Sequence, residues 1–211
     1  MGCDIHLYVE RKVPAIGWVS LGEPEALGGR NYNVFSVLAN VRNGYGFAGV
    51  PTGSGYKPIS EPRGLPDDVT EEVKAASDRW DCDGHSHSWL TLREILEYDY
   101  SQETTHQGVI PFEVFKDFDE RRTRWGGDRA DYMEPPSWSG SVFGGGTFTI
   151  PDTEARRLIA SGSVATDTSR IHVRTTWKRK YLDDMQRFLV NLLAYIKYGL
   201  DDVRLVFWFD N

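Results

Sequence analysis

The C-terminal segment constrains the fold of this chain more than any other stretch. It reads Val203-Arg204-Leu205-Val206-Phe207-Trp208-Phe209, so Arg204 is its only polar residue. A short apolar run without alternation is typical of a strand that is buried on both faces, and such strands lie inside a sheet. We therefore expect residues 203–209 to form a central strand that pairs with, or lies beside, the first strand of the chain, under the longest helix.

The first strand is predicted by alternation over residues 3–10. One set of side chains should face the core, and the other set should point the opposite way. The two sets are Cys3, Ile5, Leu7 and Val9 toward the core, and Asp4, His6, Tyr8 and Glu10 on the opposite face. Residues 17–21 are expected to form a short partner strand across a hairpin that contains Pro14 and Gly17.

Helices are predicted in several other stretches. Asn31 is a typical N-cap for a helix over residues 32–40. Thr91-Leu92-Arg93-Glu94 matches a capping box for a helix that runs to about residue 97. Further helices are expected over residues 112–122, from about 152 to 160, and over 181–198, which is the longest.

Together these elements predict an α+β fold. We expect a single α+β domain over residues 1–211, with a mixed or antiparallel central sheet that includes the N- and C-terminal strands. Helices should lie mainly on one face of the sheet, and long ordered loops should connect the elements. Residues from about 99 to 147 contain few clean periods, so they are expected to form an irregular insertion.

Charge and composition exclude some classes of function. The formal charge is −7 and the pI is near 5.3, so duplex nucleic acid is not an expected partner, because phosphate binding requires clustered Lys and Arg. No apolar stretch approaches the roughly 20 residues of a membrane span, and no signal peptide is recognisable. We expect a cytoplasmic protein without a membrane partner, whose two cysteines stay reduced.

The stretch richest in chemically reactive groups is Asp81-Cys82-Asp83-Gly84-His85-Ser86-His87-Ser88. Its Cys-Asp-x-His pattern over residues 82–85 repeats the pattern of residues 3–6, and both cysteines of the chain fall in these two copies. We expect folding to bring the two segments together as halves of one site. His85 and His87 should share one face of extended backbone.

A metal centre is the first hypothesis for this site. Thiolate, imidazole and carboxylate groups are the ligands that borderline divalent metals such as zinc, manganese, nickel or iron take in proteins. A bound metal lowers the pKa of a ligated water and polarises a phosphoryl oxygen, while Asp83 serves as general base and Ser86 contacts the substrate. The expected ligands are Asp4, His6, His85 and His87.

Three alternatives use the same residues differently. Cys3, His6, Cys82 and His85 could form a structural zinc site, although Cys3 and His6 face opposite sides of the predicted strand. Without metal, His85 and His87 could act as acid and base on a phosphodiester, because histidine titrates near neutral pH. The histidines could also belong to a hydrogen-bonded network without any ligand.

A glycine-broken loop follows the predicted helix over residues 32–40, with the sequence Val41-Arg42-Asn43-Gly44-Tyr45-Gly46-Phe47-Ala48-Gly49. Glycine lets backbone amides approach a ligand, and Tyr45 or Phe47 can stack on a ring, although a plain connecting loop also fits. There is no Walker pattern, so a standard nucleotide-phosphate cradle is not supported. The substrate contacts expected from this region are Arg30, Asn31, Arg42, Asn43 and Tyr45.

Distinctive segments occur through the first hundred residues, at 1–6, 30–32, 41–49, 63–66 and 83–92. Together they resemble a family of uncharacterised proteins from bacteriophages and prophages. The resemblance implies no particular reaction, but it implies a small protein made in the host cytoplasm. Phage accessory proteins of this kind often modify nucleotides or counter host defence, including by cleaving or sequestering cyclic-nucleotide signals.

The leading prediction for function is a phage-encoded, metal-dependent hydrolase that acts on a phosphoester of a nucleotide or cyclic-nucleotide signal. The rival is a binding protein that sequesters a nucleotide or blocks a host defence protein, and that forms a homo-oligomer. A third hypothesis is a purely structural or assembly role. For the rival, the important residues would be the aromatic ones, namely Tyr45, Phe47, Trp125 and Trp138.

Overall fold

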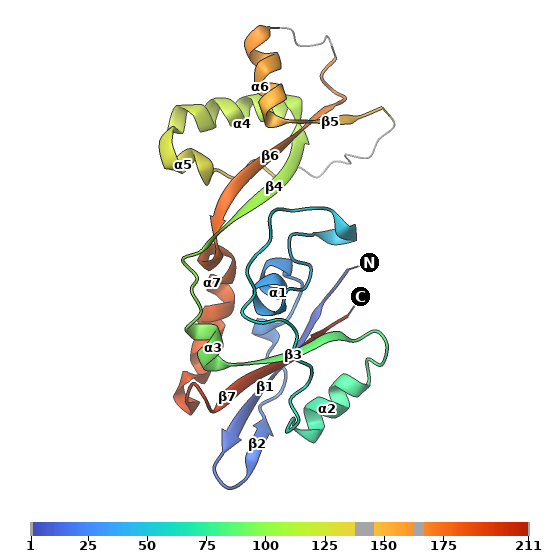
Figure 1. Ribbon diagram of the computed structural model, residues 1–211, viewed down its shortest axis with the longest axis vertical. Coiled ribbons are helices and arrows are strands. Elements are labelled where there is room, and N and C mark those ends of the chain that lie inside the picture. Colours follow the sequence, from blue (N-terminus) through green and yellow to red (C-terminus); the bar gives the residue numbers. More distant parts are fainter. Residues whose placement is uncertain (1, 138–145, 163–166, 211) are drawn as a thin grey trace. The chain divides into compact units, whose positions relative to one another are not determined.

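The computed structural model describes residues 2–137, 146–162 and 167–210. The chain forms two compact units, each of which is described by itself. Unit 1 comprises Met1–Gln102 and Lys180–Asn211, so both ends of the chain belong to it, and unit 2 comprises Glu103–Arg179. The α+β class is confirmed, since both units combine helices with a sheet (Figure 1). The expectation of a single domain stays a prediction.

Unit 1 is built on a four-stranded antiparallel sheet. Its strands are β1 (Ile5–Val13), β2 (Gly17–Ser20), β3 (His85–Thr91) and β7 (Val203–Phe209), in the order β2-β1-β7-β3. The C-terminal strand β7 therefore lies between the first strand and β3, and pairs with both (Figure 1). This confirms the prediction that the terminal strands pair and that β7 is central.

Every residue of β7 is buried, because helices cover both faces of the sheet. Leu205, Phe207 and Phe209 face the larger core, which includes residues of α1 (Tyr32–Ala39), α3 (Leu92–Leu96) and α7 (Tyr181–Leu192). On the other face, Val206 and Trp208 pack against α2 (Glu71–Asp78). Three helices thus lie on one face and one on the other, which confirms that the helices of unit 1 lie mainly on one face.

Arg204 is the polar exception in β7, and it is only 2% exposed. Its Nε donates to Glu10 Oε2 over 2.7 Å, and its Nη1 donates to Asp68 Oδ1 over 2.5 Å. Its guanidinium carbon lies 3.9 Å from the centre of the Trp18 ring. Since Glu10 is fully buried, this ion pair compensates two charges inside the unit and fixes the segment around Asp68 against the sheet.

The predicted helix ends of unit 1 are largely confirmed. Asn31 Oδ1 accepts hydrogen bonds from the backbone N–H groups of Asn33 and Val34, and so caps α1. Thr91 and Glu94 form the expected capping box of α3. The predicted helix over 181–198 is α-helical only to Leu192 and continues as the 3-10 helix η3 (Leu193–Tyr198). Two other 3-10 helices are η1 (Glu25–Leu27) and η2 (Phe47–Gly49).

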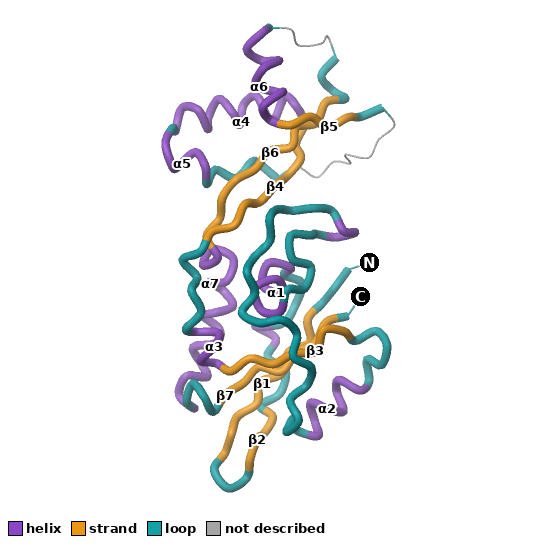
Figure 2. The backbone as a smooth tube through the Cα atoms, in the orientation of Figure 1, coloured by secondary structure: helices purple, strands orange, loops and turns teal. Residues whose placement is uncertain are grey.

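Unit 2 contains a three-stranded sheet with the order β4-β6-β5. Its strands are β4 (Glu103–Pro111), β5 (Phe148–Pro151) and β6 (Ile171–Lys180), and its helices are α4 (Phe112–Trp125), α5 (Gly127–Asp131) and α6 (Asp152–Ser161) (Figure 2). Residues of α4, α6 and the strands form a separate core. The stretch predicted to be an irregular insertion therefore holds regular elements up to Asp131.

Candidate functional site

The two Cys-Asp-x-His segments meet at one end of the sheet of unit 1. Ile5 of β1 and His85 of β3 both pair with Phe209 of β7, so the three residues form one row across the strands. This row brings the start of β1, the end of β7 and the start of β3 together (Figure 1). The two segments thus lie at the same end of the sheet, on strands β1 and β3 that β7 separates, and their role as halves of one site stays a prediction. We call Asp4, His6, His85, His87 and Asp210 the strand-end cluster.

A bulge in β3 separates the two predicted catalytic histidines. His85 pairs with Phe209 and Ser88 pairs with Phe207, so two residues of β3 lie opposite Trp208 alone. Ser86, at the bulge, has a φ of 51°, in the left-handed region. The ring of His85 therefore lies 6.1 Å from that of Phe209, on the face of the larger core.

His87 lies on the opposite face of the sheet, where its ring stacks on that of Trp208 at 5.9 Å. The prediction that His85 and His87 share a face is wrong, because the extra residue of the bulge reverses the alternation. Burial lowers the pKa of His87, and the neighbouring His85 adds to this shift. His87 thus favours the neutral form.

His6 pairs with a residue that the sequence did not single out. Its Nε2 lies 3.2 Å from Asp210 Oδ2, and Asp210 Oδ1 accepts a 2.8 Å hydrogen bond from the backbone N–H of Asp4. The ring of Trp80 lies 4.0 Å from that of His6, and the ring of Trp208 stacks on the His6 ring at 5.8 Å. Trp208 therefore stands between the imidazoles of His6 and His87.

Asp4 is engaged elsewhere. Arg30 donates to both of its carboxylate oxygens, from Nε over 3.0 Å and from Nη2 over 2.7 Å. These hydrogen bonds hold the pKa of Asp4 below its usual range. The predicted roles of both residues, Asp4 as a metal ligand and Arg30 as a phosphate contact, conflict with this geometry, because each satisfies the other.

The four predicted metal ligands do not converge. Within the described ranges, no group of three or more His, Cys, Asp or Glu side chains is placed to hold a metal ion. His85 lies on the other face of the sheet from His87, and the ion pair with Arg30 occupies Asp4. The alternative zinc site does not assemble either, because Cys3 is buried in the larger core whereas Cys82 is exposed.

Asp83, the predicted general base, and Ser86, the predicted substrate contact, lie just before and just after His85 in the chain. Asp83 is exposed in the turn before β3, and its backbone N–H donates to the Trp80 carbonyl. Ser86 Oγ lies 3.0 Å from His85 Nδ1. The buried Nε2 of His85 and Nε1 of Trp208 have no hydrogen-bond partner among the described residues. Asp83 therefore lies at the surface, whereas Ser86 contacts the ring of His85.

The loop over residues 41–56 is ordered by its own hydrogen bonds. Asn43 Nδ2 donates to Asn40 Oδ1 over 2.7 Å and to the Tyr56 carbonyl over 2.6 Å, and Asn43 Oδ1 accepts from the Tyr56 N–H over 2.6 Å. The Asn43 amide was predicted to contact substrate, but these bonds consume it. Asn31 is likewise engaged as the cap of α1. Asn43 therefore clamps the two ends of the loop together.

Glycines permit the close packing within this loop. A Cβ atom on Gly55, whose φ is +80°, would lie 2.4 Å from Asn43 Oδ1. A Cβ atom on Gly44 would lie 3.0 Å from the Gly53 carbonyl oxygen. Across the loop, the Gly46 N–H donates to the Val50 carbonyl over 2.7 Å. The glycines thus serve the internal order of the loop.

The loop is also anchored to the rest of unit 1. Tyr56 Oη donates to Asp184 Oδ2 over 2.7 Å, and the Tyr56 ring lies 4.9 Å from that of Tyr181 in α7. At the root, the Arg42 guanidinium lies 5.8 Å from the ring of Tyr32, whose hydroxyl accepts the N–H of Cys3. Through Tyr32, this root therefore lies near Cys3, just before β1 begins.

The tip of the loop exposes three large apolar side chains. Tyr45 is 52% exposed, Phe47 is 62% exposed and Val50 is 43% exposed. Trp125, in unit 2, is 64% exposed. Tyr45, Phe47 and Trp125 are three of the four aromatic residues predicted to matter in a binding protein, and all three are accessible. The fourth, Trp138, lies outside the described residues. We call Tyr45, Phe47 and Val50 the loop tip.

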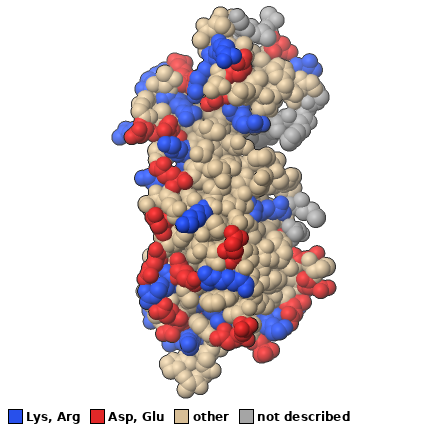
Figure 3. All heavy atoms as spheres, in the orientation of Figure 1, with Lys and Arg blue, Asp and Glu red and all other residues tan. Residues whose placement is uncertain are grey.

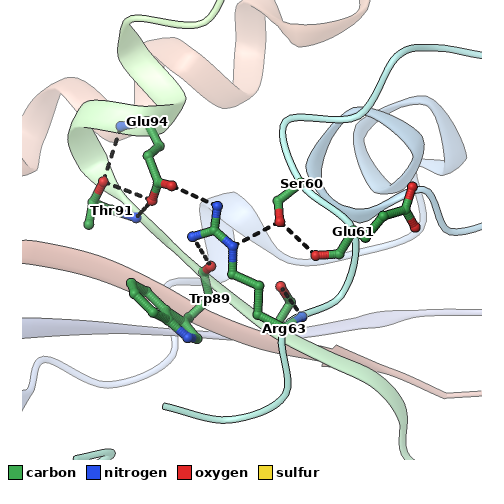
Figure 4. A network of polar contacts seen from close by, with 7 residues as sticks. Ser60, Glu61, Arg63, Trp89, Thr91 and Glu94 are labelled. Carbon is green, nitrogen blue, oxygen red and sulfur yellow. Dashed lines mark hydrogen bonds and ion pairs between the residues drawn. The ribbon is translucent and has the colours of Figure 1, made fainter.

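A second polar network fixes the long connection between η2 and α2. Arg63 Nε donates to Ser60 Oγ over 2.8 Å, and its Nη2 donates to Glu94 Oε1 over 2.7 Å (Figure 4). Because Glu94 belongs to the capping box of α3 in Figure 4, the network joins the connection to that helix. The network therefore has a structural role. The capping-box pattern predicts the contact between Thr91 and Glu94, but not the contact between Glu94 and Arg63.

Charged side chains are interspersed on the face of the molecule in Figure 3, with no continuous basic stripe. None of the helices in the described part of the chain combines the length and the apolarity that a membrane crossing requires. Comparisons with protein-family models, curated proteins and solved structures find no match.

Proposed function

We propose that unit 1 is a binding module that docks on a protein partner through the loop tip, without chemistry of its own. The observation that carries this proposal is a loop ordered by its own hydrogen bonds that holds Tyr45, Phe47 and Val50 out to solvent. Aromatic anchors on a rigid element are typical of binding hot spots, because little conformational entropy is lost when they dock.

A hydrolase is supported less well by the strand-end cluster. Acid and base groups must reach the same bond, but Trp208 stands between the imidazoles of His6 and His87. The phosphoester of the predicted nucleotide substrate would also meet the carboxylate of Asp210 beside His6. Like charge disfavours such a complex. We therefore favour the rival hypothesis of binding over the metal-dependent hydrolase.

Charge suggests the character of the partner. Unit 2 carries eleven acidic and eleven basic residues, so the formal charge of −7 resides in unit 1. A net negative unit associates faster with a net positive surface. We propose a partner with an apolar pocket in a basic surface. The resemblance to phage proteins suggests that this partner is a host protein of the host cytoplasm.

Site-specific photo-crosslinking tests the docking surface. The photoreactive residue p-benzoyl-phenylalanine would replace Tyr45, Phe47 or Val50, one at a time, in a bacterial host extract. Ile16, which is 74% exposed in the β1–β2 hairpin, provides a matched control position. All three loop positions should crosslink the same protein, because they belong to one surface, and the control position should not.

A crosslinked protein is accepted as the partner only when, after purification, it binds the purified chain. Binding should weaken as the salt concentration rises, since salt screens the attraction between opposite charges. Equal crosslinking from the loop and from position 16 would overturn the proposed docking surface. So would a purified partner whose affinity does not change when Phe47 is replaced by Ser.

A further inference from the structure

A second exposed apolar surface runs along α7 and η3, away from the loop tip in sequence. Its members are Leu182 (47% exposed), Val190 (57%), Leu193 (53%) and Ile196 (42%). Val190, Leu193 and Ile196 follow one another at three-residue steps, so they form one stripe on the outer side of the helix. Four large apolar side chains with this exposure make a surface that water solvates poorly.

This stripe is distinct from the side of α7 that builds the core. Met185 and Leu192 are fully buried, and Phe188 is 6% exposed, in the larger core of unit 1. A surface helix normally turns its apolar residues toward the core and polar residues outward. The outer stripe of α7 therefore needs an explanation other than the folding of unit 1.

Charged residues flank the stripe with opposite signs at its two ends. Asp183 lies at the N-terminal end, where one of its oxygens accepts the Lys180 N–H as a cap. Lys197 lies at the C-terminal end, with its ammonium 4.9 Å from the Tyr198 ring. No salt bridge of either side chain occurs within the described residues of the chain. An antiparallel copy of the same helix would present the complementary order of charges.

We propose that the chain forms a symmetric dimer in which α7 and η3 pair with the same helix of a second copy, antiparallel and centred on Val190. The stripe would then cover itself, as an isologous interface requires. This inference goes beyond the proposed binding function, because it uses a different surface and a different partner. It also deepens the expectation of a homo-oligomer.

The register follows from helix geometry. Asp183 lies seven residues before Val190, or about 10 Å along an α-helix. Lys197 lies seven residues after Val190, and the 3-10 segment lengthens this distance to about 13 Å. When the two Val190 side chains meet on the two-fold axis, Asp183 of each copy therefore approaches Lys197 of the other. The two ion pairs favour the antiparallel register over a parallel one, which would oppose like charges.

Sedimentation analysis over a range of protein concentrations tests the dimer. The wild-type chain should sediment as a dimer, and Val190→Asp should be monomeric because it places two carboxylates at the centre of an apolar interface. Ile16→Asp, a matched change at an exposed apolar residue of the β1–β2 hairpin, should remain dimeric. Phe47→Ser should also remain dimeric, which separates this inference from the docking proposal.

Disulfide crosslinking tests the register independently. In a Cys82→Ser background, which removes the exposed native thiol, Val190→Cys should form a homodisulfide on mild oxidation. The two-fold axis brings the two Val190 positions within disulfide range. Ile16→Cys in the same background should not crosslink, although that residue is more exposed.

Charge reversal tests the predicted ion pairs. Lys197→Glu replaces two attractive pairs with two repulsive ones, so the dimer should weaken about tenfold. Adding Asp183→Lys should restore most of the affinity. A wild-type chain that stays monomeric at its highest soluble concentration would overturn the proposal. A dimer that tolerates Val190→Asp and gives no Val190→Cys crosslink would overturn it as well.

Discussion

At the scale of single residues, the site is defined by partners that sequence motifs do not reveal. Asp4 and His6 were singled out as metal ligands, yet Arg30 holds Asp4, and Asp210 lies beside His6. The strand alternation predicted that His6 would lie on the face opposite Ile5 and Leu7, which is the face of Trp208. The alternation could not predict the partner of His6, because Asp210 lies 204 residues away from His6 in the sequence.

The depressed pKa of His87 predicts a pH dependence of stability. A histidine whose pKa is lower in the folded state contributes stability above its unfolded pKa of about 6.5, and this contribution is lost as the pH falls toward the folded value. His87→Gln should remove this dependence. Urea unfolding of both proteins between pH 8 and pH 5 measures it.

The difference in slope between the two proteins cannot exceed about 1.4 kcal/mol per pH unit, the value for one proton. The free energy of unfolding of the wild type, minus that of His87→Gln, should therefore decrease as the pH falls from 8 to 5. Parallel curves through this range would show that burial does not favour neutral His87.

Arg204 gives a second prediction at this scale. Its removal leaves the carboxylate of Glu10 buried without a counter-charge, so Arg204→Met should lower the free energy of unfolding by about 3–5 kcal/mol. The double variant Glu10→Gln with Arg204→Met should recover part of the loss, because the isolated charge is gone. Guanidinium unfolding of the two variants checks this, and equal losses in both would contradict the ion-pair account.

At the scale of elements, the sequence predicted those parts whose local signals agree with the fold. The apolar run of β7, the cap of α1 and the capping box of α3 each specify an element directly. The sequence did not predict the bulge in β3, because a serine gives no sign that its φ will be positive. The extra residue at Ser86 puts His85 and His87 on opposite faces of the sheet. The 3-10 end of α7 was missed because a three-residue spacing fits both helix types.

The 41–56 loop is an element whose order should matter for binding. Gly55→Ala places a Cβ atom 2.4 Å from Asn43 Oδ1 and adopts a left-handed φ, so it should lower the free energy of unfolding by about 1–3 kcal/mol. It should also weaken partner binding, although Gly55 is not at the loop tip. Calorimetry and binding measurements on one preparation give both values.

Gly64→Ala is the matched control for this prediction. Its φ is +79° and nothing lies within 4 Å of its Cβ position, so it carries the same backbone strain outside the loop. It should lower the free energy of unfolding by less than Gly55→Ala does, because the overlap with Asn43 is absent, and it should leave partner binding unchanged. If both variants bound the partner equally well, the order of the loop would not be what the partner recognises.

At the scale of the whole molecule, unit 1 has a sheet and a hydrophobic core of its own, without residues of unit 2. The Tyr181 N–H donates to the Gln102 carbonyl over 2.9 Å, so the chain leaves unit 1 and returns to it at adjacent points. A variant in which a short glycine-serine linker replaces residues 103–179 should therefore fold, with a single cooperative transition by circular dichroism and by tryptophan fluorescence. Loss of the transition would show that the two units fold only as one domain.

The separation into two units was the least predictable feature. Residues 99–147 offered few clean periods, and the strands that pair within unit 2 lie far apart in the sequence. Composition did not mark the boundary, although the balance of charge differs between the units. Long-range pairing of this kind is decided by packing, which local patterns do not encode.

The affinity of the purified partner for Phe47→Ser, compared with Ile16→Ser, tests the docking of the loop tip most directly. Both changes remove a large exposed apolar side chain, and only Phe47 belongs to the proposed surface. Isothermal titration should show a loss of about tenfold or more for Phe47→Ser and no change for Ile16→Ser. Equal affinities for the two variants would contradict the account.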